Sequence, residues 1–350
     1  MKKVIFLTLL IFIFSSQGVK AIDWCSDILH PPQPDKAIEA CTDFINQGIE
    51  DIDKAYNNRG TAYSSKGLYD RAIQDFNRAI ELKPDFDVAF FNRGNAYGSK
   101  GLHDRAIQDY NRAINLNSNN VSFFYNRGNA YNSKGLYDKA IQDFNKAIGL
   151  KPNYDMAYNN RGNAYRSKGL HDRAIQDFNK AIELNPDNDM AYNNRGIIYG
   201  SQKMYDKAMQ DFNKAIELNP DNYLAFYNRG KTYRSKGLDD RAFRDFSKVI
   251  ELNPYNVSAY NQRGSIYRAK GLDDKAIQEF NMAIILNPDY VGSYYNLACL
   301  YSVNKDFENG CSWLQKAVNK GFSSWEHIKR DPDFNNMRNQ SCFQEIVKGK

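Results

Sequence analysis

Apolar and aromatic residues recur along most of this chain with the spacing of helix faces, and the pattern repeats every 34 residues. Within residues 53–86, Tyr56, Gly60 and Tyr63 lie at i, i+4 and i+7, which places them on one face of a helix. Gly67 then interrupts the pattern. A second stripe follows, made up of Ala72, Ile73, Phe76, Ala79 and Ile80. Each repeat therefore predicts two helices separated by a short turn.

The repeats follow one another without insertion. A glycine at position 8 falls at residues 60, 94, 128, 162, 196, 230 and 264, and Ala298 takes its place in the last repeat. The predicted units are 53–86, 87–120, 121–154, 155–188, 189–222, 223–256, 257–290 and a degenerate unit 291–324. A lone helix pair cannot bury both stripes, so the pairs must stack on their neighbours. The sequence thus predicts an all-α solenoid of antiparallel helix pairs.

The segments that flank the repeats have the features of caps. Residues 22–52 contain DKAIEACTDFIN, which copies the second-helix pattern and predicts a degenerate half repeat. Residues 325–350 carry Phe334, Phe343 and Ile346 at helical spacing and predict capping helices. Solenoids need such caps to shield the apolar faces of their terminal repeats from water.

The order of residue types within a unit resembles the tetratricopeptide repeat, in an exported bacterial form. An aromatic stands at position 4, Gly at 8, Tyr at 11, Ala at 20, Phe at 24, Ala at 27 and Pro at 32, over residues 53 to about 324. The resemblance implies a right-handed superhelical solenoid with a concave groove that binds partners. It is specific for the fold and says little about which partner is bound.

Position 7 departs from the family pattern, which usually has Leu there. It holds Arg59, Arg93, Arg127, Arg161, Arg195, Arg229 and Arg263. An acid recurs in step at position 23, at Asp75, Asp109, Asp143, Asp177, Asp211, Asp245 and Glu279. We expect one ion pair per unit, and two independent exposed rows are the alternative.

A row of asparagines occupies positions that the resemblance assigns to the groove, which are positions 2, 5, 6, 9, 12 and 13. Position 6 holds Asn58, Asn92, Asn126, Asn160, Asn194 and Asn228, and position 9 holds Asn95, Asn129 and Asn163. An amide offers both donors and acceptors, so such a ladder can pair with the backbone of an extended peptide. The alternative is that each Asn braces the neighbouring repeat or is only a solvated polar residue.

Aromatic and basic residues accompany the asparagines at the groove positions. Position 5 adds Phe91, Tyr125 and Tyr227, position 12 adds Arg166, Arg234 and Arg268, and position 9 of the sixth unit is Lys231. We expect the aromatic rings to offer apolar contact near the first units. The basic side chains favour an acidic part of the ligand over units four to seven.

The N-terminal segment predicts export. Lys2 and Lys3 precede an apolar run from Val4 to Phe14, and small residues allow cleavage after Ala21, so residues 1–21 are expected to be a signal peptide. The alternative is an uncleaved anchor, for which the run is short of the about 20 residues that a membrane span needs. Its loss removes three lysines and lowers the net charge from +6 to about +3. No basic block supports nucleic-acid binding, and no later run is apolar enough to predict an integral membrane segment.

The five cysteines lie near the two ends of the chain. Cys25 and Cys41 fall at facing places of the N-terminal cap, and an exported protein keeps disulfides, so we expect these two to pair. An odd count means that at least one thiol is free or pairs with another molecule. The pairing among Cys299, Cys311 and Cys342 is left open by the sequence.

No catalytic, metal or cofactor motif accompanies the repeats, so we expect neither an enzyme nor a cofactor. The favoured interpretation is a scaffold or adaptor, periplasmic or secreted, that binds a protein or extended peptide in the groove. Two alternatives remain. One is a secreted effector that engages a host protein, and the other is a glycan-binding or enzymatic protein with an unrecognised site.

Overall fold

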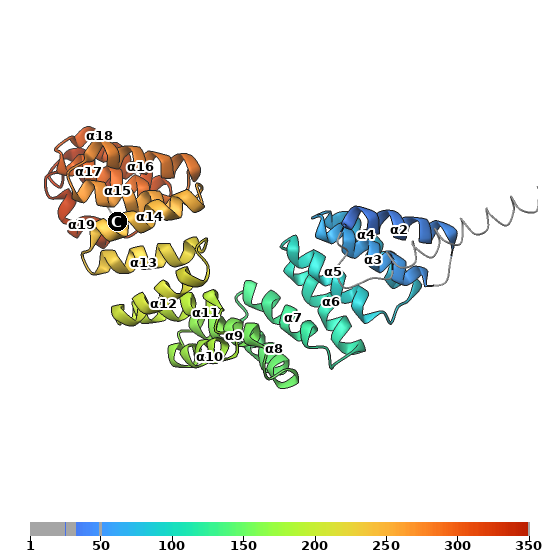
Figure 1. Ribbon diagram of the computed structural model, residues 1–350. Helices are drawn as coiled ribbons and strands as arrows, with labels where there is room; N and C mark the ends of the chain where they lie inside the picture. The colour runs from blue at the N-terminus through green and yellow to red at the C-terminus, as the bar shows by residue number, and fades with distance from the viewer. Residues whose placement is uncertain (1–24, 26–32, 49–50, 349–350) are drawn as a thin grey trace, which may run out of the picture. The chain divides into compact units, whose positions relative to one another are not determined.

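A computed structural model describes residues 25, 33–48 and 51–348, and all regular secondary structure in that part of the chain is helical (Figure 1). The predicted signal peptide, residues 1–21, lies outside the described residues. The chain divides into two compact units, Met1–Pro186 and Asp187–Lys350. Each compact unit is a stack of antiparallel helix pairs, which is the fold class expected from the sequence.

Each predicted repeat contains one pair of helices. The first compact unit contains α2 (Pro34–Gln47), α3 (Ile52–Ser65), α4 (Tyr69–Leu82), α5 (Asp87–Ser99), α6 (His103–Leu116), α7 (Val121–Ser133), α8 (Tyr137–Leu150), α9 (Asp155–Ser167) and α10 (His171–Leu184). The second contains α11 (Asp189–Ser201), α12 (Tyr205–Leu218), α13 (Tyr223–Ser235), α14 (Asp239–Leu252), α15 (Val257–Ala269), α16 (Asp273–Leu286), α17 (Val291–Val303), α18 (Phe307–Asn319), α19 (Trp325–Arg330), the 3-10 turn η1 (Pro332–Phe334) and α20 (Ser341–Val347).

The two helices of a repeat are joined by a tight turn at position 15. Gly67 adopts φ 72° there, a left-handed conformation that glycine reaches without steric cost. In the fifth repeat the residue at this position is Lys203, which adopts φ 61° and so carries the strain that a side chain adds. The turn geometry is thus kept even where the glycine is not.

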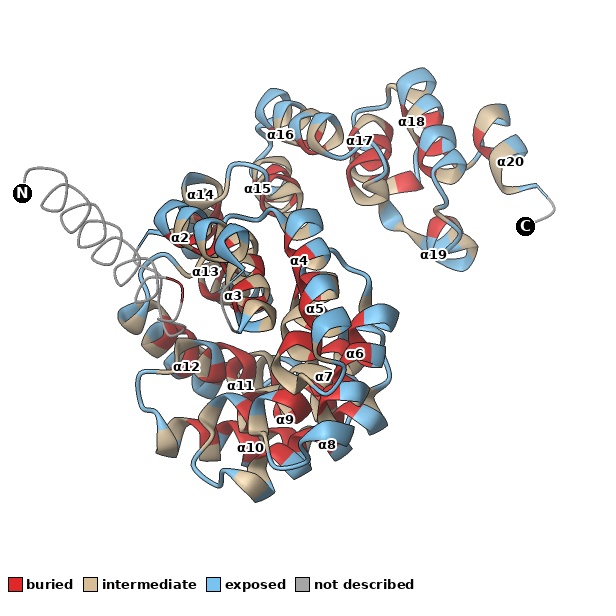
Figure 2. Cartoon of the chain, turned by 90° about the vertical axis from the view of Figure 1, so that its right-hand side faces the viewer, coloured by how far each residue is buried: buried red, intermediate tan, exposed pale blue. Residues whose placement is uncertain are grey.

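Close approach of the paired helices depends on the small residue at position 8. A Cβ placed on Gly60 would lie 2.7 Å from Cε1 of Phe76, so no larger residue fits without a shift of that ring. Phe76 and its equivalents at position 24 are almost fully buried and form the centre of each pair. In Figure 2 the buried residues lie on the helix sides that face neighbouring helices.

The arginine at position 7 pairs with the acid at position 23 of the same repeat, as the sequence predicted. In the first repeat Arg59 Nε donates to Asp75 Oδ2 at 2.7 Å and Nη2 donates to Oδ1 at 2.8 Å, a bidentate contact between α3 and α4. The same ion pair joins Arg93 to Asp109, Arg127 to Asp143, Arg161 to Asp177, Arg195 to Asp211, Arg229 to Asp245 and Arg263 to Glu279. The alternative of two independent exposed rows is wrong.

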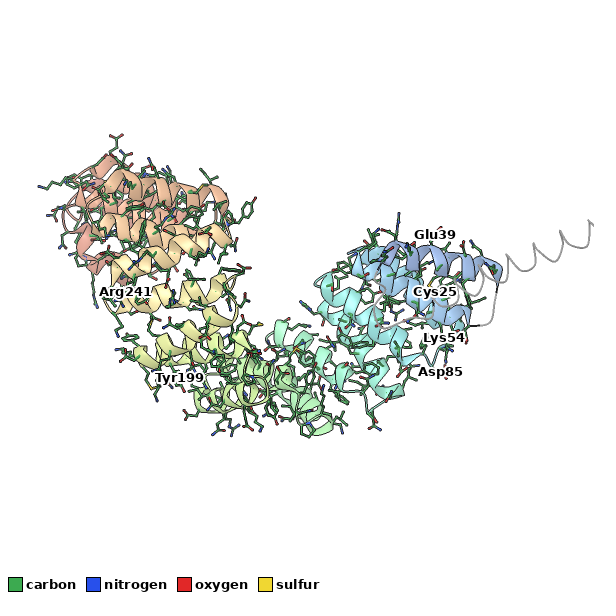
Figure 3. All side chains as sticks on the ribbon, viewed as in Figure 1. Cys25, Glu39, Lys54, Asp85, Tyr199 and Arg241 are labelled. Atoms are coloured by element: carbon green, nitrogen blue, oxygen red, sulfur yellow. A yellow bond between two sulfur atoms is a disulfide. The ribbon has the colours of Figure 1, made fainter. Side chains whose placement is uncertain are left out.

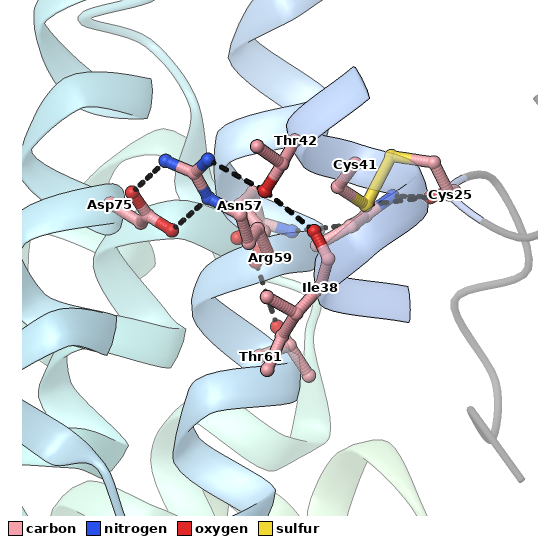
Figure 4. Close-up of a disulfide and its surroundings, with 9 residues drawn as sticks. Cys25, Ile38, Cys41, Thr42, Asn57, Arg59, Thr61 and Asp75 are labelled. Atoms are coloured by element: carbon pink, nitrogen blue, oxygen red, sulfur yellow. Dashed lines mark hydrogen bonds and ion pairs between the residues drawn. A yellow bond between two sulfur atoms is a disulfide. The ribbon is translucent and has the colours of Figure 1, made fainter. Parts of the chain in front are cut away.

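The third guanidinium nitrogen reaches the preceding repeat. Arg93 Nη1 donates to Asn77 Oδ1 at 2.6 Å, so one side chain holds α5, α6 and α4 together. Equivalent bonds run from Arg127 to Asn111, from Arg161 to Asn145, from Arg229 to Asn213 and from Arg263 to Ser247. At the N-terminal end Thr42 of α2 takes this place against Arg59, which shows that α2 substitutes for a second helix (Figure 4).

A second set of charges lies on the outside of the turns. Lys168 pairs with Asp138 of the preceding repeat, and the carboxylate is largely exposed. Basic residues at position 19 lie over the tyrosine at position 11, as Arg241 does over the Tyr233 ring at 5.8 Å and Lys207 over the Tyr199 ring at 5.5 Å. Figure 3 labels Arg241 and Tyr199. These solvent-exposed contacts each contribute little, at about 0–1 kcal/mol.

Both ends of the array carry a disulfide. Cys25 is joined to Cys41 of α2 (Figure 4), and Cys311 of α18 is joined to Cys342 of α20. Cys299 is a buried free thiol. The second pair was left open by the sequence, because the C-terminal segment falls outside the register of the repeats.

The C-terminal segment covers the last repeat, as expected of a cap. Phe334 and Phe343 are buried against Tyr295 and Leu314 of the degenerate repeat. Arg268 of α15 pairs with Asp333 at 2.5 Å, which ties the cap to the preceding repeat. The predicted apolar residues therefore end the stack by burying its terminal face.

We predict that the ion pair at positions 7 and 23 is essential to a repeat. Asp177→Ala leaves the Arg161 charge in a site from which water is largely excluded, and this should lower the free energy of unfolding by about 3–5 kcal/mol. Burial raises the pKa of the Asp177 carboxyl although Arg161 acts to lower it, and this rise reflects the loss of water around the pair. Denaturant unfolding of the two single variants and the double variant Arg161→Ala/Asp177→Ala measures the coupling.

Lys168→Ala is the matched control, because it removes an exposed ion pair that the same repeat makes with the preceding one and should cost only about 0–1 kcal/mol. Small, additive effects of the Arg161 and Asp177 substitutions would contradict a structural role for the pair.

We also predict two disulfides and one free thiol in the isolated protein. Peptide mass mapping without reductant should recover Cys25 linked to Cys41 and Cys311 linked to Cys342, with Cys299 alkylated only after unfolding because it is buried. The shorter loop spans 16 residues, so Cys41→Ser should destabilise the N-terminal end by about 3 kcal/mol. Recovery of alkylated Cys25 and Cys41 from the native protein would contradict the first pairing.

Candidate functional site

The first helices of neighbouring repeats contact one another directly. Contacts join α3 to α5, α5 to α7, α7 to α9, α11 to α13 and α15 to α17. Hydrogen bonds and pockets along these contacts involve residues at positions 5, 6, 9, 12 and 13 of the repeat. We call the residues at these positions the first-helix surface.

Four position-6 amides brace the neighbouring repeat through position 5. Asn92 Nδ2 donates to Asn57 Oδ1 at 3.0 Å, and Asn57 is 2% exposed. The equivalent bonds run from Asn160 to the Tyr125 hydroxyl at 2.9 Å, from Asn228 to Asn193 at 3.1 Å and from Asn296 to Asn261 at 2.8 Å. The bracing interpretation that the sequence left open therefore holds for these donors, and their capacity to bind a peptide stays a prediction.

The brace is missing where position 5 cannot accept a hydrogen bond. Phe91 stands there in the second repeat, and the next asparagine, Asn126, instead donates to the Ser122 carbonyl of its own helix at 2.9 Å. Phe91 packs on Tyr110 and Phe123, with ring centroids 5.9 and 4.9 Å apart. Asn126 is therefore a groove-position amide that makes no side-chain bond to the preceding repeat.

The remaining asparagines of the predicted ladder have varied surroundings. Asn58 donates to the Cys25 carbonyl at 2.5 Å, which fastens the N-terminal cap. At position 9, Asn95 accepts from the Tyr110 hydroxyl and Asn129 accepts from Asn160, both at 2.8 Å. Asn163 Oδ1 is buried without a hydrogen-bond partner, and Asn194 is 8% exposed. The ladder is thus not one uniform row of available amides.

The aromatic residues at position 5 contribute mainly to packing. Tyr125 lies against Phe144 and Tyr154, and Tyr227 lies against Phe246. Burial raises the pKa of both tyrosine hydroxyls. These rings, like that of Phe91, therefore offer a ligand less apolar surface than the sequence suggested.

The four basic residues of the predicted groove divide into two kinds. Arg268 is paired with Asp333, and Arg234 donates to Gln262 at 2.9 Å and lies 3.7 Å from Asp239. Arg166 and Lys231, unlike the first two, form no ion pair within the described part of the chain.

Burial lowers the pKa of Arg166, which means that its charge has lost water without gaining an anion. Lys231 is exposed, with Nζ 5.6 Å from the centroid of the Tyr227 ring. Of the four predicted basic residues, these two remain as candidates for contact with an acidic ligand.

Two pockets open on the first-helix surface, each within one compact unit and each at the same positions of two adjacent repeats. One has a volume of about 340 Å³ and is lined by Asn95, Gly98, Ser99, His103, Tyr110, Asn126, Asn129, Ala130 and Ser133. The other has a volume of about 230 Å³ and is lined by Ile197, Gly200, Ser201, Tyr205, Phe212, Asn228, Lys231, Thr232 and Ser235. Sequence reasoning missed Gly98 and Gly200. Both lie outside positions 8 and 15, where glycine recurs in the repeat, and this departure is the sequence signal that could have identified them.

One group of potential metal ligands occurs among the described residues, formed by Cys299, Asp331 and Asp333. Its carboxylates are already engaged, because Arg268 pairs with Asp333 and the Tyr295 hydroxyl donates to Asp331 at 2.5 Å. Burial raises the pKa of the Cys299 thiol, so it stays protonated and unreactive. The cluster is better suited to fastening the C-terminal cap than to chemistry.

Sequence profiles of one family match most of these repeats. The tetratricopeptide repeat matches residues 53–86, 156–188, 190–222, 212–244 and 291–319, and the TPR repeat matches 94–135, 128–169 and 264–302. The matches cover more than half of the chain. The chain therefore belongs to the tetratricopeptide repeat family.

Similar proteins agree with the fold. A tetratricopeptide repeat protein from Parabacteroides merdae has a TM-score of 0.58 at 22% identity, covering 76% of this chain and 99% of that one. A chain of the Cut9–Hcn1 hetero-tetramer of the APC/C has a TM-score of 0.59 at 14% sequence identity. The match covers 77% of this chain and 53% of that one. A chloroplastic protein of Arabidopsis thaliana is 33% identical over 54 residues, which span 15% of this chain and 16% of that relative.

The family places the protein in a functional class. Tetratricopeptide repeats serve as protein-interaction scaffolds that bind peptides or proteins, and no enzyme family is indicated for this chain. Among the helices of the described residues, none combines the length and apolar character needed to cross a membrane.

We predict that the position-6 asparagines differ in what they contribute to stability. Asn92→Ala removes a donor from the buried Asn57 amide and should lower the free energy of unfolding by about 1–3 kcal/mol. Asn126→Ala removes only a bond within its own helix and gains up to about 0.7 kcal/mol of helix propensity, so stability should be unchanged or higher. Chemical denaturation of both variants makes the comparison. Equal losses of stability in the two variants would contradict the assignment of bracing to Asn92 and not to Asn126.

Proposed function

We propose that this protein is an exported, non-catalytic scaffold that binds an extended segment of a partner protein along the first-helix surface. The family supports the scaffold class, and two pockets open on the first-helix surface. The partner segment would lie across adjacent repeats within a compact unit. Its backbone would meet the amides that do not brace a neighbouring repeat.

Arg166 is the observation that carries this proposal. A guanidinium that is partly removed from water gains from a compensating group, and none of the described carboxylates pairs with Arg166. An aspartate or glutamate of a bound peptide would supply that group through a charge-assisted hydrogen bond. The acidic preference predicted from the sequence therefore rests on Arg166 in the fourth repeat and on Lys231 in the sixth.

Asn126 is a second observation that supports the same proposal. Its amide makes no side-chain bond to the second repeat, because Phe91 offers no acceptor there. It also lines the larger pocket. The N–H groups of an extended backbone that passes this point could donate to Oδ1 of Asn126, one repeat away from the asparagines on either side.

Export is proposed on the predicted signal peptide and is supported by the cysteines. Two cysteine pairs at disulfide distance suit an oxidising compartment, where such bonds form and persist. The periplasm and the cell exterior both fit this requirement. The intact mass of the isolated protein checks cleavage after Ala21.

The test measures binding of short fluorescent peptides, acidic and basic, by polarisation with the mature protein. Arg166→Gln should weaken binding of the acidic peptides by about 1.5–3 kcal/mol, the contribution of a hydrogen bond to a charged group. Lys180→Gln is the matched control, since it removes the same charge from an exposed site on α10. Equal weakening in the two variants would show a general charge effect, and unchanged binding in Arg166→Gln would exclude this surface.

A further inference from the structure

Position 12 of the first helices spans the widest range of side-chain size on the first-helix surface, from glycine to arginine. It holds Ser64, Gly98, Asn132, Arg166, Gly200, Arg234, Arg268 and Ser302. The two pockets open at its two glycines. A glycine at position 12 thus accompanies each of these two pockets between adjacent repeats.

Neither glycine is required by the fold. Both lie inside helices, in α5 and α11, and neither has a positive φ. A Cβ on Gly200 would lie 3.8 Å from Thr232 Oγ1 and 4.0 Å from Ala208 Cβ, which are ordinary contacts. At Gly196, by contrast, it would lie 2.8 Å from Phe212 Cε1. Glycine weakens a helix relative to alanine, so neither packing nor helix propensity accounts for its presence at position 12.

The pocket at Gly200 has the size and lining of a site for one apolar side chain. Its volume of about 230 Å³ is below the range of roughly 300–1,000 Å³ that takes drug-sized molecules. Ile197, Phe212 and Tyr205 contribute apolar and aromatic surface to its wall. Asn228 and Lys231 are polar members of that wall that come from the next first helix.

Lys231 adds a charge requirement. Its ammonium group is exposed and has no carboxylate within ion-pair distance in the described part of the chain. It belongs to the pocket lining, so a ligand that fills the pocket brings its neighbouring groups close to this charge. An acidic residue next to the buried side chain would complement it.

We infer that the pocket at Gly200 selects a leucine- or methionine-sized side chain of an extended partner segment whose adjacent residue is Asp or Glu. This inference rests on the proposed function and specifies what that function recognises in the second compact unit. Asn228 lines the pocket, and because its Nδ2 donates to Asn193, its Oδ1 is left as the amide atom that can accept from a ligand. Gly200 is thus a residue that determines specificity by leaving space.

The equivalent pocket at Gly98 provides an internal comparison. Its wall replaces Ile197 by Asn95, Tyr205 by His103 and Lys231 by Asn129. Because these groups are polar or uncharged, the Gly98 pocket does not share the preference for an apolar side chain beside an acid. The two pockets can therefore be tested against each other in one protein.

The experiment uses the full mature chain on an array of extended peptides. Each peptide carries one varied position, from Ala to Leu, Met, Phe, Ser and Lys, beside Asp, Asn or Lys. The variants are Gly200→Arg, which copies the Arg166 and Arg234 found at the same position, and Gly98→Arg as the control. Both exchange glycine for a better helix former, so thermal unfolding should show an unchanged or higher midpoint.

We expect the wild type to prefer Leu or Met beside Asp, Gly200→Arg to lose that preference at least tenfold, and Gly98→Arg to keep it. If peptides bind but Gly200→Arg keeps the preference, the pocket inference is overturned while the proposed function stands. If the wild type binds no peptide, both fail. If Gly200→Arg instead changes the mass of the protein by light scattering, the pocket holds a second copy of the chain, and the inference is also overturned.

Discussion

The bidentate contact between the arginine at position 7 and the acid at position 23 is the interaction on which the seven regular repeats depend. It joins the two helices of a pair, and its third nitrogen fixes the preceding second helix, so one side chain sets both the crossing within a repeat and the stacking between repeats. Burial raises the pKa of Asp177 and Asp211, which shows that the pair loses hydration when it forms. Such a pair contributes more to specifying the geometry of the helices than to net stability. A register shift would leave a charge without its partner.

The features that point to function are the places where this regular scaffold departs from its own pattern. A structural residue recurs in every repeat because each repeat needs it. Phe91, Gly98, Arg166 and Gly200 each stand at a position whose occupant changes along the array. Phe91 leaves the Asn126 amide without an acceptor in the preceding repeat, and the two glycines line the two pockets. Arg166 carries a partly desolvated charge. Under the proposed function, the solenoid supplies a constant frame and these variable positions define local recognition.

The sequence predicted the fold well because the period of 34 fixes the helices, their turns and their partners. It also predicted the pairing of Arg161 with Asp177, since two charged rows in step on adjacent helices can meet once per repeat. It could not separate bracing from binding at Asn92, because an amide has the same donors and acceptors in either role. Nor could it pair Cys311 with Cys342, because the C-terminal segment follows no repeat and spacing carries no information there.

The two disulfides act differently at the two ends of the array. A stack of repeats frays from its ends, because a terminal repeat has only one neighbour. The Cys311–Cys342 bond ties the C-terminal cap to the last repeat and so opposes fraying at that end, whereas the Cys25–Cys41 bond lies within the segment that precedes the first repeat. Reduction of the Cys311–Cys342 bond removes that restraint, so the opening of the C-terminal end depends on the redox state of the surroundings.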